Sequence, residues 1–122
     1  MRRFALIIAV VVSGCVTPSI PIPPPDPAMM LFQLVGVGSA STASLTYPPV
    51  DTYEGGIAYV YNRTQGVGVI QNVMPNGGIG PTPPTPAALG DQMIVSVENN
   101  QQTQSTCIIL QQGLQDPTNY CP

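Results

Sequence analysis

Gly56-Ile-Ala-Tyr-Val-Tyr61 alternates larger and smaller side chains, and a repeat of two residues is the period of a β-strand. A second stretch, Gln92-Met-Ile-Val-Ser-Val-Glu98, has an apolar residue at every second position. Both patterns predict strands with two different faces. The residues expected to share a face are Ile57, Tyr59 and Tyr61, against Ala58 and Val60, and in the second strand Met93, Val95 and Val97.

Shorter runs of strand-forming residues lie on both sides of these stretches. They are rich in β-branched or aromatic residues and end at Gly, Pro, Asn or Asp, and no window has a capped helical period. About six or seven short strands with frequent turn signals predict an all-β fold, a small antiparallel β-sandwich. The further runs are Met30–Val37, Ser44–Tyr47, Val67–Val73 and Thr103–Leu110.

Two connecting segments have distinct chemistry. Asn76–Ala87 contains four prolines, which cannot donate to a strand ladder, so this segment cannot be a central strand. Glu98-Asn-Asn-Gln-Gln102 is short and polar and lies between two expected strands, which predicts a hairpin.

Three short turn motifs lie in the second half of the chain: Thr64-Gln65-Gly66, Asn76-Gly77 and Gly90-Asp91. Together with the strands around them, they resemble the small Ig-like or carboxypeptidase-regulatory-like modules of bacterial surface proteins. The resemblance implies an Ig-like β-sandwich over residues 30–122. Such modules bind, space or cap and are not usually catalytic, and their fold does not determine their function.

The chain begins Met1-Arg-Arg-Phe-Ala-Leu-Ile-Ile-Ala-Val-Val-Val-Ser-Gly-Cys15, which has the order of a secretory signal peptide. Its apolar run is about half of the roughly 20 residues that a transmembrane helix needs. Val12-Ser13-Gly14-Cys15 resembles the lipobox of bacterial lipoproteins, with Val where that family usually has Leu. The resemblance implies removal of the signal peptide, residues 1–14, and lipidation of Cys15. The alternative is an ordinary cleavage site in which Cys15 is only a small residue.

The resemblance to lipoproteins also implies a location in the bacterial cell envelope. In many Gram-negative lipoproteins an Asp after the lipidated cysteine retains the protein in the inner membrane, and here that residue is Val16. We therefore expect the outer membrane and palmitate labelling. Residues 15–29 are proline-rich and are expected to form an extended linker that holds the domain roughly 40 Å from the membrane.

The chain has three cysteines, an odd number. Cys107 lies in the last expected strand, and Gly113 and Asp116-Pro117 allow the tail to turn back, so we expect a disulfide between Cys107 and Cys121. An exported location permits this bond, and two buried thiols are the alternative. If Cys107 and Cys121 pair, Cys15 has no cysteine partner, and acylation of Cys15 would explain the odd number of cysteines.

The composition excludes several classes of function. Without residues 1–14 the chain keeps one base, Arg63, against six acids, so nucleic acid is excluded as a partner. The absence of His and Lys excludes His-based triads, His metal sites and Schiff bases. The acids Asp51, Glu54, Asp91 and Glu98 lack the spacing of a calcium loop. We expect no catalytic residues, no metal and no cofactor.

Four tyrosines are candidates for ligand binding, because an aromatic ring can stack on a sugar while its hydroxyl forms a hydrogen bond. They are Tyr47, Tyr53, Tyr59 and Tyr61. The alternative for the last two is an ordinary half-buried sheet face. We expect a non-enzymatic, lipid-anchored envelope protein, a structural or protein-interaction module with an envelope protein or glycan as its partner. The alternative function is a carbohydrate- or peptidoglycan-binding module that uses the tyrosines.

Overall fold

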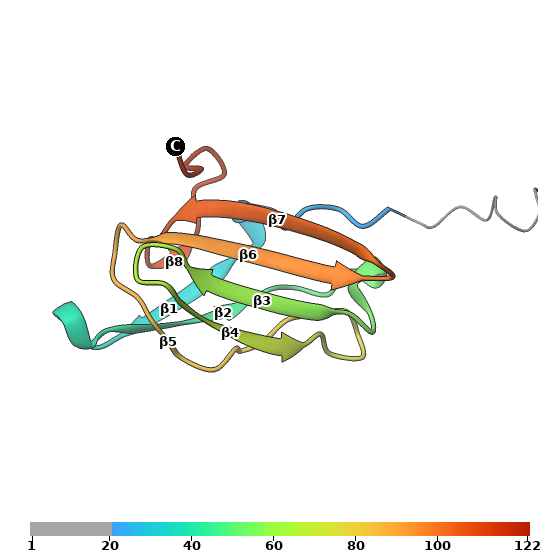
Figure 1. The fold of residues 1–122 in the computed structure, drawn as a ribbon, viewed down its shortest axis with the longest axis horizontal. Coiled ribbons are helices and arrows are strands. Elements are labelled where there is room, and N and C mark those ends of the chain that lie inside the picture. The colour runs from blue at the N-terminus through green and yellow to red at the C-terminus, as the bar shows by residue number, and fades with distance from the viewer. Residues whose placement is uncertain (1–20) are drawn as a thin grey trace, which may run out of the picture.

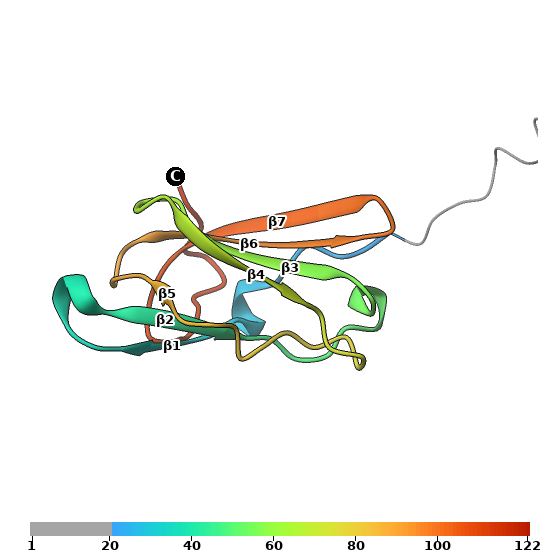
Figure 2. The ribbon, with the colours of Figure 1, turned by 60° about the horizontal axis from the view of Figure 1, so that its bottom comes forward.

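The computed structural model describes residues 21–122, in which two four-stranded antiparallel sheets pack face to face (Figures 1 and 2). This confirms the predicted small all-β sandwich. Three single 3₁₀ turns, η1 (Pro27–Met29), η2 (Gly38–Ala40) and η3 (Asp51–Tyr53), lie between the strands. The strands are β1 (Leu31–Val35), β2 (Thr42–Thr46), β3 (Ile57–Asn62), β4 (Val67–Asn72), β5 (Thr85–Pro86), β6 (Gln92–Asn99), β7 (Gln102–Ile109) and β8 (Gly113–Leu114).

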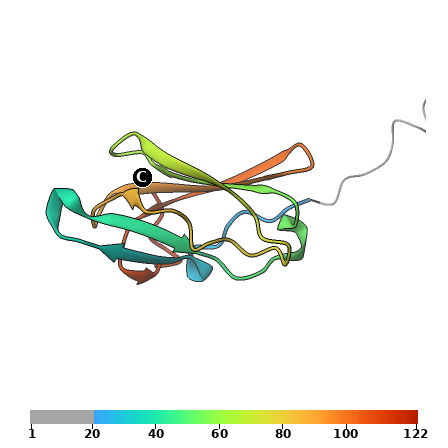
Figure 3. The same ribbon diagram turned by 90° about the horizontal axis from the view of Figure 1, so that it is seen from below.

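The chain passes repeatedly between the two layers, which are seen edge-on in Figure 3. One sheet has the order β5-β2-β1-β8, and the other has the order β4-β3-β6-β7. In the second sheet the β3–β4 and β6–β7 hairpins lie side by side, with β3 paired to β6. Hairpins joined by crossings between the sheets are the arrangement of Ig-like sandwiches.

The inward faces of the strands match the alternation in the sequence. Ala58 and Val60 of β3 are each 1% exposed, whereas Tyr59 and Tyr61 lie on the outer face. Met93, Val95 and Val97 of β6 are fully buried. Apolar residues from both sheets form one core, so the sandwich is stabilised mainly by burial of apolar surface.

The hairpin predicted between β6 and β7 is confirmed. Asn100 and Gln101 form its two-residue turn with φ values of 50° and 65°, as a type I′ hairpin turn requires. The proline-rich segment contributes β5, a two-residue strand at the edge of its sheet where it pairs with β2, so proline stays out of the central strands. The sequence patterns gave no sign of β5 or β8, because two residues carry no periodicity.

Two glycines let the proline-rich segment approach the neighbouring backbone closely. A side chain at Gly77 would collide with the carbonyl oxygen of Val50, and one at Gly80 with that of Leu45. Their φ values are +87° and +80°, which also favour glycine. The segment can therefore lie directly against β2 and cover the core.

Candidate functional site

Residues 22–27, part of the expected linker, lie against the sandwich, and we call them the N-terminal strap. Ile22 is 4% exposed, and its N–H donates to Oε1 of Gln102 over 3.1 Å. The Thr106 hydroxyl donates to the Pro25 carbonyl over 2.6 Å. The expectation of a free linker as far as residue 29 is therefore wrong from Ile22 onward, because these residues form hydrogen bonds with side chains of β7.

Tyr47 and Tyr53 lie under the strap. They are 4% and 0% exposed, and their ring centroids are 6.1 Å apart. The Tyr53 hydroxyl donates to the Pro23 carbonyl over 2.7 Å, and the Asp26 N–H donates to the Tyr47 hydroxyl over 2.8 Å. Ligand binding by these two tyrosines is therefore a wrong prediction: their rings fill the core and their hydroxyls hold the strap.

Burial also sets the protonation state of this pair. It raises the pKa of both Tyr47 and Tyr53 above the ordinary value for tyrosine, and the effect is larger for Tyr53. Both hydroxyls therefore stay neutral at ordinary pH, as the donor role of Tyr53 requires.

Tyr59 and Tyr61 lie on the outer face of β3 and form, with Ile70, what we call the tyrosine platform. Ile70 is opposite Tyr59 in the β3–β4 pair and is 68% exposed, and Tyr61 is 43% exposed. A shallow groove of about 250 Å³ lies among these three residues. The Tyr59 hydroxyl donates to Oε2 of Glu98 over 2.9 Å, and this hydrogen bond raises the pKa of Tyr59.

Gly68 shapes the platform. It lies opposite Tyr61, and a Cβ at this position would be 2.6 Å from the Val60 carbonyl oxygen and 3.1 Å from Cδ1 of Tyr61. The Tyr61 ring thus lies where a side chain at position 68 would stand. Our sequence reasoning missed Ile70, because Val67–Val73 does not alternate; the register set by the Thr64-Gln65-Gly66 turn was the available signal.

The β1–β2 and β5–β6 connections lie at the end of the sandwich opposite to the point where the chain enters the strap (Figure 1), and their exposed apolar residues form a surface there. We call it the distal apolar end. Its most exposed residues, Val35, Val37 and Leu89, are 63%, 89% and 67% exposed. They come from the β1–β2 connection and the β5–β6 connection, and Val37 and Leu89 line one cleft of about 520 Å³.

The sequence patterns did not predict the exposed apolar residues at this end. Met30–Val37 was expected to be one strand, but β1 ends at Val35, because Gly36 adopts a φ of +95° and the η2 turn follows. The available signal was Gly36-Val-Gly38, an apolar residue between two glycines.

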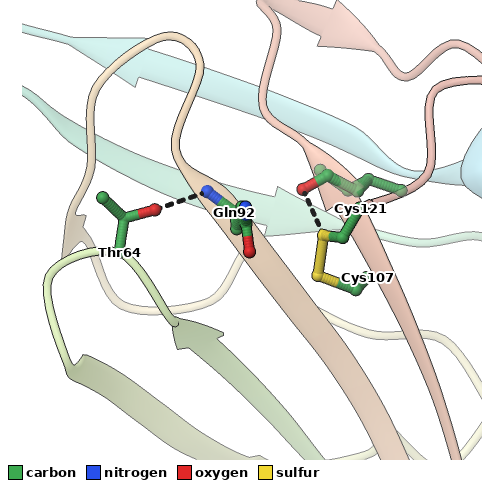
Figure 4. The surroundings of a disulfide bond; sticks show 5 residues. Thr64, Gln92, Cys107 and Cys121 are labelled. Carbon is green, nitrogen blue, oxygen red and sulfur yellow. Dashed lines mark hydrogen bonds between the residues drawn. A yellow bond between two sulfur atoms is a disulfide. The ribbon is translucent and has the colours of Figure 1, made fainter.

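The predicted disulfide joins Cys107 of β7 to Cys121 in the C-terminal tail, with the Cα atoms 5.3 Å apart (Figure 4). The tail runs back along β7, and the Cys121 N–H donates to the Cys107 carbonyl over 3.0 Å. Figure 4 also shows the Gln92 N–H donating to the Thr64 hydroxyl over 2.9 Å, which ties the β3–β4 turn to the start of β6.

A polar network fixes the same turn from within. Asn62 is fully buried; its amide donates to Oδ2 of Asp91 over 2.8 Å, and its Oδ1 accepts from the Gln65 N–H over 3.0 Å. Burial of Asp91 opposes its ionisation, but hydrogen bonds from Asn62, the Ala88 N–H and Gln65 outweigh this and lower the pKa of Asp91. Asn62 at the end of β3 and Asp91 of the Gly90-Asp91 motif are therefore parts of one structural clamp.

Cys15 and residues 1–14, the expected signal peptide, lie outside the described residues. Within residues 21–122, no three His, Cys, Asp or Glu side chains gather as a metal site would require. Over the same range, no helix has the length and apolar character needed to cross a bilayer. Comparisons with family models, with curated proteins and with solved structures find no match to this chain.

Proposed function

We propose that this chain is a non-enzymatic, lipid-anchored protein of the bacterial cell envelope, in the outer membrane where there are two membranes, and that its sandwich is a structural or protein-interaction module. The observation that carries the proposal is the distal apolar end. Val35, Val37 and Leu89 are each more than half exposed. They belong to the end of β1 and to the connections that lie opposite to the strap entry. Exposed apolar surface of this kind favours a protein partner.

The strap gives the proposed anchor an orientation. The buried Ile22 follows Cys15 by seven positions, and a stretch of that length spans at most about 25 Å even when fully extended. A lipid on Cys15 would thus hold the sandwich nearer the membrane than a free linker of residues 15–29 would. The end where the strap begins would face the membrane, and the distal apolar end would face away from it.

The charges at the strap end fit this orientation. Asp51 and Glu54 lie beside Ile22 and line a common cleft with it. Carboxylates next to anionic lipid headgroups are repelled, so this end has no tendency to enter the bilayer. The apolar side chains of the other end would then remain available to a partner.

Site-specific photocrosslinking in intact envelopes tests the proposal. A photoreactive residue at Val37 should give a discrete protein adduct, and the same residue at Gln101, in the β6–β7 turn, should not. Leu89→Ser should abolish the Val37 adduct, whereas Leu114→Ser, another exposed apolar residue, should leave it intact. Equal adducts at Val37 and Gln101, or none at Val37, would refute a specific interaction at this end.

The tyrosine platform supports a second candidate function, the binding of carbohydrate or peptidoglycan. Exposed Tyr61 beside Tyr59 offers aromatic faces, and Glu98 adds a hydrogen-bond acceptor. Calorimetric titration with soluble peptidoglycan fragments should then show binding that Tyr61→Ala abolishes and that Tyr120→Ala, an exposed tyrosine elsewhere, preserves. Binding that is equal in both variants would exclude the platform.

A further inference from the structure

The two edge strands of the β4-β3-β6-β7 sheet differ in whether another segment of the chain forms backbone hydrogen bonds with them. On the β7 edge, the tail adds backbone hydrogen bonds from the Cys121 N–H to the Cys107 carbonyl and from the Ile109 N–H to the Asn119 carbonyl. On the β4 edge, no strand or loop of residues 21–122 hydrogen-bonds to the backbone on the outer side. Figure 1 shows β4 as the outermost strand of this sheet.

The register identifies the backbone groups that point outward from β4. The Val73 N–H donates to the Gly56 carbonyl over 3.0 Å, so these opposed residues form a hydrogen-bonded pair. Hydrogen-bonded pairs alternate along an antiparallel ladder. The N–H and C=O groups of Val67, Val69 and Gln71 therefore point to β3, and those of the residues between them point outward. These are Gly68, Ile70 and Asn72.

The side chains of β4 include none of the features that usually prevent an edge strand from pairing with a further strand. Natural edge strands usually carry a charge, a proline or a bulge that discourages pairing with another strand. Val67-Gly-Val-Ile-Gln-Asn72 has no charge and no proline, and it pairs with β3 without interruption over six residues. Ile70, at the middle of the outward-pointing set, is 68% exposed.

We propose that β4 is the dimerisation edge of this protein and that its occupant is the β4 strand of a second copy, in antiparallel register about a two-fold axis at Ile70. Ile70 would lie opposite Ile70 of the partner subunit, and Gly68 opposite Asn72 of the partner subunit. Because the two-fold axis is normal to the sheet, the outer faces of the two copies lie on the same side. The two four-stranded sheets then form one continuous sheet. The outward N–H and C=O groups of all three residues then gain partners.

The position of Arg63 permits a second copy in this register. Arg63, the only base in residues 21–122, precedes β4 by four positions. Antiparallel pairing about Ile70 places the two Arg63 side chains at opposite ends of the joined strands. No like charges therefore meet across the axis. The two Ile70 side chains, which are exposed in the single chain, would cover each other in the dimer. The proposal does not depend on lipidation or on a partner at the distal apolar end.

Disulfide trapping of the full chain in the cells that produce it tests the register. Directly opposed residues of a hydrogen-bonded pair have Cα atoms about 5.5 Å apart, within the range a disulfide spans. Under mild oxidation, Ile70→Cys should give a covalent dimer on a non-reducing gel. Leu114→Cys, which replaces an exposed apolar side chain on the other sheet and outside the distal apolar end, should stay monomeric. Absence of the Ile70→Cys dimer, or equal dimer from both variants, would overturn the proposal.

Sedimentation velocity on the purified protein gives an independent readout. The native chain should show a concentration-dependent dimer, and Ile70→Lys should weaken it by about tenfold or more, because two like charges would oppose each other at the axis. Leu114→Lys should leave the dimer unchanged. A native protein that remains monomeric at every concentration, or dimers that Ile70→Lys does not weaken, would refute pairing through β4.

Discussion

The Tyr53 hydroxyl donates a 2.7 Å hydrogen bond to the Pro23 carbonyl, thirty positions earlier in the chain. This contact joins the buried centre of the sandwich to a segment whose proline content alone suggests a free spacer. Together with the bond from the Asp26 N–H to the Tyr47 hydroxyl, it makes the strap part of the folded domain. The fold therefore begins near the proposed lipid anchor.

Removing either tyrosine hydroxyl should loosen the strap at a defined point. Tyr47→Phe removes the acceptor of the Asp26 N–H, and Tyr53→Phe removes the donor to Pro23. Each substitution should cost about 1 kcal/mol of stability, since the ring remains in the core. Amide hydrogen exchange should be faster at Asp26 in Tyr47→Phe than in Tyr53→Phe. Unchanged exchange at Asp26 in both variants would contradict a docked strap.

The disulfide should supply a large share of the stability of this small domain. Closing a loop of about 15 residues contributes roughly 3 kcal/mol in the chain-entropy model. Urea unfolding should show that reduction of the native protein and the double variant Cys107→Ser/Cys121→Ser lower the free energy of unfolding by similar amounts. Two titratable thiols from this pair in the unfolded, unreduced protein would show that the bond does not form.

Acid should weaken the clamp between Asn62 and Asp91. The pKa of Asp91 is lower in the folded protein than its ordinary value of 3.8, so its ionised form stabilises the fold. That stabilisation is fully present above the unfolded pKa and is lost as pH falls through the folded pKa. Urea unfolding at a series of pH values should show Asp91→Asn less stable than the native protein near neutrality, with the gap closing in acid. A gap independent of pH would contradict this assignment.

Lipidation should depend on a single residue. If Cys15 carries the lipid, Cys15→Ser should abolish palmitate labelling and accumulate as an uncleaved precursor, because the modified thiol directs cleavage in the lipoproteins that this N-terminus resembles. Metabolic labelling and the mass of the purified protein measure both effects. Cys107→Ser is the matched control and should be labelled normally. Normal maturation of Cys15→Ser would refute the anchor on which the proposed function rests.

The sequence by itself determined the six longer strands, the hairpin at Asn100-Gln101 and the pairing of Cys107 with Cys121. The inward faces of β3 and β6 followed from a repeat of two residues, which depends only on the local geometry of a strand. A turn such as the one after Asn99 is likewise specified by its own residues. The cysteine pair could be predicted because the residues between them allow the tail to return.

Only the tertiary structure decided which of four similar tyrosines are exposed. Tyr47 and Tyr53 are buried because the strap and the core close over them, whereas Tyr59 and Tyr61 stay on an outer face. The edge position of β4 and the separation of the distal apolar end from the strap were likewise absent from the sequence patterns. Burial and exposure depend on which distant segments pack together, and local periodicity carries no information about those partners.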